Sequence, residues 1–270
     1  MALEVMKAND YVPSDDYAKF FVCGDFGTGK SEFAATFPTL PKKGFVFNFD
    51  RKIATYSRYP GWDYMEYPLT APGWAQFEKD EKEVARLVAE GEYASVIVDS
   101  TTAMTDMAME RALQLDPKRS ATQGPIWNVH YQMVRNLMEG KLRAFLNYNC
   151  NLVVIAHLDI KTDAETGAIV GIEPLLTGQL AVRIPGYFEE VYCAFTRTSG
   201  EKTTWYLRTI PRGYYKARST MSGKMGLLPA EIPNNYQAVI SAYRTAVQKM
   251  KEQMAARKAA ASQQGGVPTT

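Results

Sequence analysis

The chain of 270 residues has few cysteines, few histidines and no long apolar run. Its three cysteines, Cys23, Cys150 and Cys193, lie far apart without C-x-x-C spacing, which excludes a disulfide framework and a cysteine-based zinc site. The two histidines, His130 and His157, are too few for a histidine-rich metal centre. No segment approaches the roughly 18 consecutive apolar residues of a membrane span, and no secretory signal is visible. We therefore expect a cytoplasmic protein with reduced, buried thiols and no membrane partner.

The composition is that of a globular protein. Hydrophobic residues make up 46% of the chain and charged residues 22%, which is sufficient for a sizeable core and excludes disorder over most of the length. A chain of this length allows one large domain or two small ones. We expect a single domain over residues 1–254 and a flexible tail over residues 255–270.

The net charge of +2 conceals an uneven distribution. Residues 196–270 contain 12 Lys or Arg and 3 acidic residues, a balance of +9, which leaves 19 basic and 26 acidic residues, or −7, for the rest. A basic quarter on an acidic body favours a surface that faces a polyanion. A basic face that is merely solvated is the alternative.

Strand-like runs alternate with amphipathic helical patterns, which is typical of an α/β fold. We expect strands at 19–23, 45–49, 63–67, 95–98 and 152–156, and helices at 30–37, 74–90, 102–115 and 134–146. Further along, the pattern predicts a loop or hairpin at 159–177, strands at 190–197 and 204–210, and a helix at about 235–254. That helix begins near a capping residue, Asn234 or Asn235. Its heptad-like seam is short, which favours packing on the body over pairing with a partner helix.

Residues 24–31, GDFGTGKS, fit the phosphate-binding pattern G-x-x-x-x-G-K-[ST] in full. Gly24 and Gly29 allow the backbone to curl so that successive amides face the phosphates, and the following helix adds its positive dipole end. We expect Lys30 to reach the β- and γ-phosphates of ATP and Ser31 to bind Mg²⁺. The remaining residues of the loop also contact the nucleotide: Asp25, Phe26, Gly27 and Thr28.

Three polar residues end apolar strands. Asp99 follows Val96-Ile97-Val98, at the edge where open α/β sheets bind ligands, so we expect it to complete the magnesium site. The alternative for Asp99 is a turn or a helix cap. Asp50 could orient the attacking water, and His157 could lie near the γ-phosphate. A turn-forming aspartate and a hydrogen-bonded edge histidine are the alternatives for these two.

The order of these features resembles that of the RecA-like ATPases. Within that group the chain is similar to compact phage-type nucleotide-binding or single-strand-annealing recombination proteins. The resemblance extends over residues 15–230 and is carried by the segments GDFGTGKS, VIVDST and VVIAHLD. It implies a RecA-like P-loop core, with a mainly parallel sheet flanked by helices, followed by a β-rich segment and a terminal helix.

The resemblance also implies roles for individual residues. Asp50 corresponds to the carboxylate that activates water. The family more often has Glu there, and the shorter side chain predicts slower hydrolysis. His157 corresponds to the residue that senses the γ-phosphate. Lys216 and Arg218 correspond to a basic pair that reaches the nucleotide across a subunit boundary.

By the same resemblance the chain forms a filament or ring with ATP between subunits and single-stranded DNA along the inside. ATP then acts as a switch on a DNA-binding loop at 161–177, and a second DNA-facing loop lies at 118–125. An accessory single-stranded-DNA-binding protein is an expected partner. Candidates for phosphate contacts are Lys118, Arg119, Lys161, Arg212 and Lys216, and candidates for base stacking are Trp127 and Tyr214.

Three other functions compete with a DNA-stimulated ATPase. A P-loop kinase for a small metabolite would favour an arginine-rich lid, whereas the basic residues here gather in the last quarter. An AAA+ remodelling motor is disfavoured because Ser100, not Glu, follows Asp99 and no helical lid of adequate length follows. A scaffold that binds nucleotide without hydrolysis is the third. Stimulation by single-stranded DNA separates the recombinase from all three.

Overall fold

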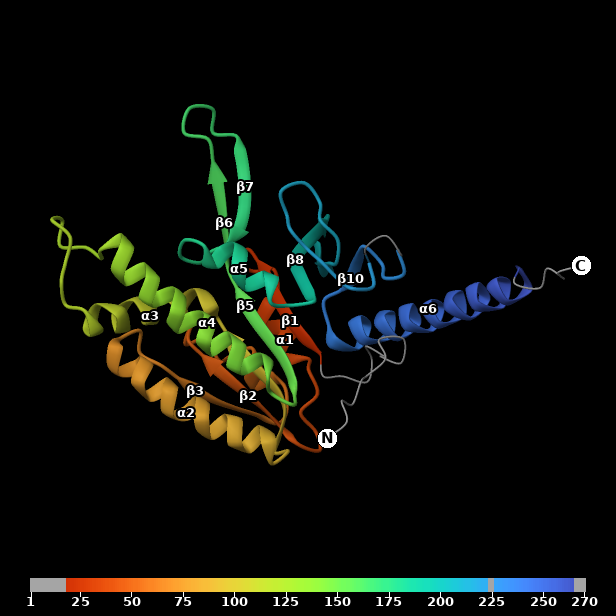
Figure 1. The fold of residues 1–270 in the computed structure, drawn as a ribbon, viewed down its shortest axis with the longest axis horizontal. Coiled ribbons are helices and arrows are strands. Elements are labelled where there is room, and N and C mark those ends of the chain that lie inside the picture. The colour runs from red at the N-terminus through yellow and green to blue at the C-terminus, as the bar shows by residue number, and fades with distance from the viewer. Residues whose placement is uncertain (1–17, 223–225, 265–270) are drawn as a thin grey trace, which may run out of the picture.

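An eight-stranded, mainly parallel sheet forms the centre of the fold (Figure 1). The computed structural model describes residues 18–222 and 226–264, so the expected domain start at residue 1 and the last six tail residues lie outside the described residues. The strands of this sheet are β1 (Lys19–Gly24), β2 (Lys43–Asn48), β3 (Trp62–Glu66), β4 (Tyr93–Asp99), β5 (Asn151–Ala156), β8 (Glu190–Ser199), β9 (Lys202–Arg208) and β10 (Glu231–Pro233).

The strand order is β10-β9-β8-β1-β5-β4-β2-β3. The six strands from β8 to β3 are parallel to one another, whereas β9 pairs antiparallel with both β8 and β10 at one edge. The carboxyl ends of β1, β5, β4 and β2 therefore lie side by side at one edge of the sheet. The predicted fold class, a parallel sheet with a β-rich segment and a terminal helix after it, is confirmed.

Helices cover both faces of the sheet, which explains why its strands are apolar on both sides. Along β1, Phe21 and Cys23 face one hydrophobic cluster, and Phe20 and Val22 face the other. The first cluster contains side chains of α2 (Ala71–Ala89), α3 (Thr101–Leu115), α4 (Gln132–Leu146) and α5 (Leu180–Gly186). The second contains those of α1 (Lys30–Ala35), a 3-10 helix (Tyr56–Arg58) and α6 (Tyr236–Gln264). All three cysteines are free and buried, as predicted.

An aromatic cluster anchors β2 on the face covered by α2. The ring of Phe77 meets Phe47 and Phe49 edge-on at centroid distances of 5.6 and 5.1 Å. All three rings are buried, and edge-to-face contacts add to the free energy of apolar burial. Because Phe49 directly precedes Asp50, this packing fixes the position of Asp50 beyond the end of β2.

A two-stranded hairpin stands off the body and is visible at the top of Figure 1. It consists of β6 (Leu158–Thr162) and β7 (Ile169–Pro174) and begins directly after His157. Ile172 is buried at its base, whereas Val170 nearer the tip is 54% exposed. The sequence predicted either a loop or a hairpin here, and the structure shows the hairpin.

The terminal helix corrects one expectation. The flexible tail was expected to begin at residue 255, but α6 continues to Gln264 because its last segment, AARKAAASQQ, consists mainly of strong helix formers. The side chain of Asn235 accepts a hydrogen bond from the amide of Ala238 at 2.8 Å and caps the helix, as the sequence allowed. Val239 and Val247 are buried against the sheet, so the first part of α6 packs on the body. Its remainder extends away from the sheet (Figure 1).

Among the residues that the structure describes, no helix combines the length and the apolar character needed to cross a bilayer.

Candidate nucleotide-binding site

The segment between β1 and α1 has the backbone that a phosphate-binding loop requires. Gly27 and Gly29 have φ angles of 71° and 82°, in the left-handed region that favours glycine. A Cβ atom at Gly24 would lie 2.6 Å from Thr28 Oγ1, and one at Gly29 would lie 2.4 Å from Asn234 Nδ2. A side chain at Gly24 would collide with Thr28 and with the carbonyl oxygen of Ala194 on β8, and one at Gly29 would collide with Asn234, so glycine is required at both positions.

The Lys30 side chain is folded into this loop. Its Nζ donates hydrogen bonds to the carbonyl oxygens of Gly24 and Asp25 at 2.9 and 2.7 Å. Lys30 is only 6% exposed, and burial lowers the pKa of its ammonium group while Asp99 opposes that effect. The ammonium therefore occupies the centre of the loop, where phosphate oxygens are stronger acceptors than the two carbonyls.

Two residues that sequence reasoning missed hold the loop from the edge of the sheet. Trp205, on β9, donates its indole hydrogen to the carbonyl oxygen of Gly27 at 3.0 Å. Asn234, directly after β10, donates from Nδ2 to the carbonyl oxygen of Gly29 at 2.9 Å. The sequence suggested Asn234 only as a helix cap. It gave no indication of the role of Trp205, because the contact of Trp205 with Gly27 joins segments far apart in the chain.

Ser31, Tyr56 and Asp99 form the second part of the site. Ser31 Oγ and Tyr56 OH both donate to Asp99 Oδ2, at 2.7 and 2.8 Å. Asp99 is 4% exposed, and burial raises the pKa of its carboxyl group while the hydrogen bonds from the two hydroxyls oppose that effect. Tyr56 was not predicted. It lies in the turn-rich segment after β2, whose sequence did not indicate any contact with the nucleotide site.

The oxygen atoms of Ser31 and Asp99 suit Mg²⁺. Hydroxyl and carboxylate oxygens are hard ligands, and Mg²⁺ in nucleotide sites takes one or two carboxylates together with substrate phosphates. The residues present therefore fit the ion, and Mg²⁺ held there would neutralise negative charge on the β- and γ-phosphates.

Asp50 and His157 meet beside this pair. Asp50 Oδ2 lies 2.9 Å from His157 Nε2, and Asp50 Oδ1 accepts a hydrogen bond from Ser100 Oγ at 2.7 Å. Burial raises the pKa of Asp50, but the hydrogen bonds from His157 and Ser100 outweigh it, so the pKa lies below its ordinary value. An ionised carboxylate only accepts hydrogen bonds, so Nε2 of His157 carries the hydrogen. Ser100 was considered only as the residue that follows Asp99 in place of a glutamate, and its contact with Asp50 was missed.

The structure thus brings the predicted residues of the nucleotide site together. Asp99, Asp50 and His157 lie at or just after the ends of β4, β2 and β5, and Lys30 begins α1 after the loop that follows β1. Phosphates bound in the loop would face the magnesium ligands and the Asp50–His157 pair. The arrangement can bind a nucleoside triphosphate and place a carboxylate near its terminal phosphate.

The remaining predicted residues make their contacts elsewhere in this chain. Lys216 Nζ lies 3.6 Å from Glu173 Oε1, and the Arg218 guanidinium donates to the carbonyl oxygen of Phe188. Among the candidates for DNA contacts, Lys161 pairs with Glu173 and Arg212 with Glu231, and Arg119 donates to the backbone carbonyls of Leu113, Asp116 and Lys118. Lys118 is exposed.

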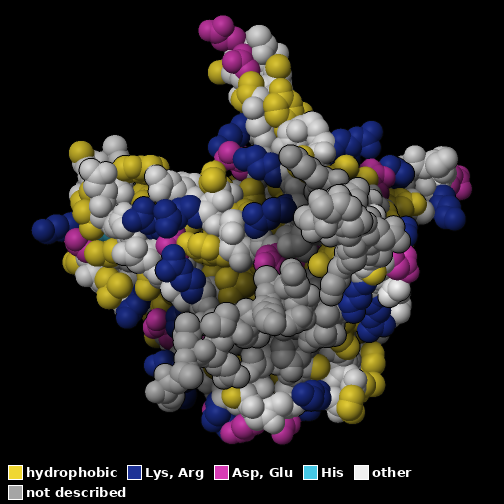
Figure 2. Space-filling model, turned by 45° about the vertical axis from the view of Figure 1, so that its right-hand side comes forward, with side chains coloured by type: hydrophobic (Ala, Val, Ile, Leu, Met, Phe, Trp, Pro, Cys, Tyr) yellow, Lys and Arg dark blue, Asp and Glu magenta, His cyan; other side chains and the backbone are white. Residues whose placement is uncertain are grey.

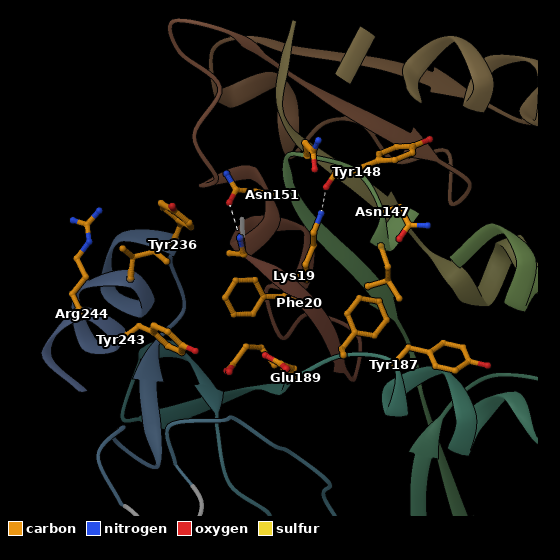
Figure 3. Close-up of a pocket in the computed structure, with 16 residues that line it drawn as sticks. Lys19, Phe20, Asn147, Tyr148, Asn151, Tyr187, Glu189, Tyr236, Tyr243 and Arg244 are labelled. Atoms are coloured by element: carbon orange, nitrogen blue, oxygen red, sulfur yellow. Dashed lines mark hydrogen bonds between the residues drawn. The ribbon is translucent and has the colours of Figure 1, made fainter. Parts of the chain in front are cut away.

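A separate cavity of about 570 Å³ lies at the amino ends of the strands (Figure 3). Lys19 and Tyr148 line it from the sheet side, and Tyr236, Tyr243 and Arg244 line it from α6. Lys19 begins β1 and Gly24 ends it, so the full strand separates this cavity from the phosphate-binding loop. It is no part of the nucleotide site.

A parallel sheet with a phosphate-binding loop after a central strand and a carboxylate on a nearby strand defines a P-loop NTPase with a RecA-like fold. The sequence pattern of a protein family described as "AAA domain" matches residues 16–220. The chain therefore belongs to this family. The description names a domain and no activity, so the expectation against a remodelling motor stays a prediction.

Solved structures with similarity to the chain include two archaeal proteins. A KaiC-like protein from Pyrococcus horikoshii is 11% identical, with a TM-score of 0.40 over 71% of this chain and 77% of that one. The flagellar accessory protein FlaH from Methanocaldococcus jannaschii is 12% identical, with a TM-score of 0.38 over 80% and 83% of the two chains. Both TM-scores are low, so the fold assignment depends on the strand order and the family match. No curated protein matches the chain.

Proposed function

We propose that the protein hydrolyses ATP and uses its nucleotide state to control binding to single-stranded DNA, in strand annealing or exchange. The observation that carries this proposal is the contact of Asp50 with His157, because His157 directly precedes the projecting hairpin. The His157 side chain thus connects the nucleotide site to the hairpin on the surface.

The catalytic roles follow from the positions of the side chains. Lys30 and Ser31 bind the phosphates and Mg²⁺, with Asp99 completing the ion site. Asp50 is ionised and lies beside them, so it orients the attacking water and accepts its proton. His157 donates to Asp50 and, when a γ-phosphate is present, has an alternative acceptor for the same hydrogen.

The backbone of His157 fastens the hairpin to the body. Its amide donates to Thr102 Oγ1 at 3.1 Å, and its carbonyl oxygen accepts from the amide of Leu175 at 2.8 Å. One end of the hairpin thus continues from His157 and the other end is hydrogen-bonded to it. A shift of the His157 side chain between Asp50 and a γ-phosphate would move both ends together. This is the kind of local contact through which nucleotide hydrolysis releases a segment.

The hairpin itself carries an acidic surplus. Asp159, Asp163, Glu165 and Glu173 outnumber its one basic residue, Lys161. In Figure 2 acidic and hydrophobic side chains mark its tip, and Lys and Arg side chains gather on the body below it. Because phosphates avoid a negative surface, we place the DNA backbone on the body of the protein, and the hairpin acts as the element that moves.

Assembly into a filament or ring belongs to the same proposal. Lys216 and Arg218 would reach the nucleotide of a neighbouring subunit, after exchanging Glu173 and the carbonyl of Phe188 for phosphate oxygens. A single-stranded-DNA-binding protein would serve as an accessory partner. Two alternative functions differ from this one in the reaction catalysed. A kinase would transfer the phosphoryl group to a small acceptor molecule, and a scaffold would bind the nucleotide without hydrolysing it.

Fluorescence anisotropy of a labelled oligothymidine tests the proposal. The strand is titrated with protein alone, with ADP, with ATP and with a non-hydrolysable ATP analogue, and a duplex of equal length is the control. We expect the tightest binding to the single strand in the presence of the analogue. Equal affinity in all four nucleotide states, or no binding, would contradict the proposal.

A further inference from the structure

We propose that a cavity of about 210 Å³ between the start of α4 and the connection from β7 to α5 binds one unstacked base of a single strand. This inference rests on the proposed function, and it locates one contact with the single strand on the protein surface. Trp127 and Tyr131 form an aromatic wall before α4, and Thr177 and Gln179 form a second wall from the connection between β7 and α5.

Trp127 is held open to solvent by a rigid turn. The residue is 65% exposed, and its ring centroid lies 4.4 Å from that of Tyr131 at an interplanar angle of 38°. Within the same π-helical turn, His130 is fully buried: Nδ1 accepts from the amide of Ile126 at 2.7 Å, and Nε2 contacts the carbonyl oxygen of Asp116 at 2.8 Å. The buried histidine fixes the turn, so the exposed indole is pre-organised as a surface on which a base stacks.

Polar groups line the rest of the cavity. Arg135 Nη1 donates to Gln179 Oε1 at 3.3 Å, which brings a guanidinium and an amide together across it. Asn128 and Gln132 add further amides to the lining. Amide groups both donate and accept, so they pair with the edge of any base. The lining therefore predicts binding of bases with little preference for sequence.

The size of the cavity limits what it can hold. Its volume of about 210 Å³ is below the roughly 300 Å³ at which pockets for drug-sized ligands begin. The cavity thus suits a single planar ring system and is too small for a whole nucleoside triphosphate.

The position of the cavity links it to the switch. Trp127 follows the exposed segment 118–125, and Thr177 lies two residues beyond Leu175, whose amide bonds the carbonyl oxygen of His157. A movement of the hairpin would therefore shift one wall of the cavity against the other. Nucleotide state would change the affinity for a base without any change in Trp127 itself.

The test compares Trp127→Ala with the wild type on two labelled strands of equal length, oligothymidine and a strand of abasic sites, with the ATP analogue present. We expect roughly 5- to 150-fold weaker binding to oligothymidine, which is the range that stacking of one base on an aromatic ring contributes. Binding to the abasic strand should be unchanged. The slope of log affinity against log salt should also stay unchanged, because no phosphate contact is removed.

Two further variants serve as controls. Trp127→Phe keeps a ring and should retain most of the affinity, whereas Val182→Ala, at another exposed apolar residue, should bind like the wild type. Gln179→Ala tests the second wall and should weaken binding to oligothymidine alone. Unfolding temperature and ATPase rate without DNA should be the same in all four variants.

The outcomes separate the two proposals. Wild-type binding to oligothymidine with an undiminished affinity of Trp127→Ala overturns the base site and leaves the proposed function standing. An equal loss of Trp127→Ala affinity for both strands also overturns the base site, because the effect would then not involve a base. Failure of the wild type to bind any single strand overturns both proposals.

Discussion

Asp50 and His157 lie 107 positions apart in the sequence, yet Asp50 Oδ2 and His157 Nε2 are 2.9 Å apart. Their strands, β2 and β5, are not neighbours; β4 lies between them and contributes Ser100, which donates to the other oxygen of Asp50. Three consecutive strand ends are thus joined through one carboxylate. If a γ-phosphate drew His157 away from Asp50, the base of the hairpin, which follows His157 directly, would move as well.

Replacing Asp50 with Asn should slow ATP hydrolysis by about a hundredfold or more and leave nucleotide affinity within about twofold. The amide cannot accept the proton of the attacking water, and general-base catalysis contributes roughly 10²- to 10⁴-fold. Steady-state phosphate release and titration with a fluorescent nucleotide measure the two quantities. Glu165→Gln, an equivalent change at the exposed tip of the hairpin, is the control. Equal turnover of Asp50→Asn and the wild type would remove Asp50 from catalysis.

The same substitution should affect stability in a pH-dependent way. The folded-state pKa of Asp50 lies below its ordinary value, so its contribution to the free energy of unfolding is present above about pH 4. It is lost as the pH falls through the lower, folded-state pKa. Asp50→Asn should therefore lower the unfolding temperature at pH 7, and the difference from the wild type should shrink below about pH 4. A difference that stays constant down to pH 3 would contradict the contact with His157.

Replacing Lys30 with Ala should abolish measurable nucleotide binding. The substitution removes the buried ammonium at the centre of the loop and leaves the carbonyls of Gly24 and Asp25 facing the phosphates. Titration with a fluorescent ATP analogue measures the loss. Lys161→Ala on the hairpin, which removes a lysine outside the site, should bind nucleotide normally. Unchanged affinity in Lys30→Ala would place the nucleotide elsewhere.

Trp205 and Asn234 should influence nucleotide affinity through the backbone of the loop. Trp205→Phe and Asn234→Ala each remove one hydrogen bond to a loop carbonyl, worth about 0.5–1.5 kcal/mol, so each should weaken binding by roughly two- to tenfold. The double variant should lose more than either single one. If both variants bind ATP as the wild type does, the loop keeps its shape without these contacts.

The parts of the site that the sequence predicted are the local ones. The loop 24–31 matches a local sequence pattern, in which Gly29 takes the left-handed φ angle of the turn and Lys30 reaches back six residues to the carbonyl oxygen of Gly24. Asp99, Asp50 and His157 were found because each ends an apolar strand, and parallel strands bring their carboxyl ends to one edge. That reasoning gave the edge, but not the hydrogen bond between Asp50 and His157.

The residues that escaped prediction act through contacts between distant segments. Tyr56 donates to Asp99 from a short turn that has no hydrophobic periodicity. Trp205 donates to the carbonyl oxygen of Gly27 from a strand whose sequence looks like that of any other strand. Short elements were missed as well: β10 has three residues, and α5 has seven with Pro185 inside it. Such elements are specified by their packing on the sheet, which a single sequence does not display.

The coupling of the nucleotide site to DNA is best measured as the rate of ATP hydrolysis with and without single-stranded DNA, at low and at higher salt. We expect strong stimulation by the single strand that fades as salt rises, since the DNA backbone is held by charge. Asp50→Asn should show no stimulated turnover at either salt concentration. Hydrolysis by the wild type at the same rate with and without DNA, at both salt concentrations, would contradict the coupling of the nucleotide site to DNA.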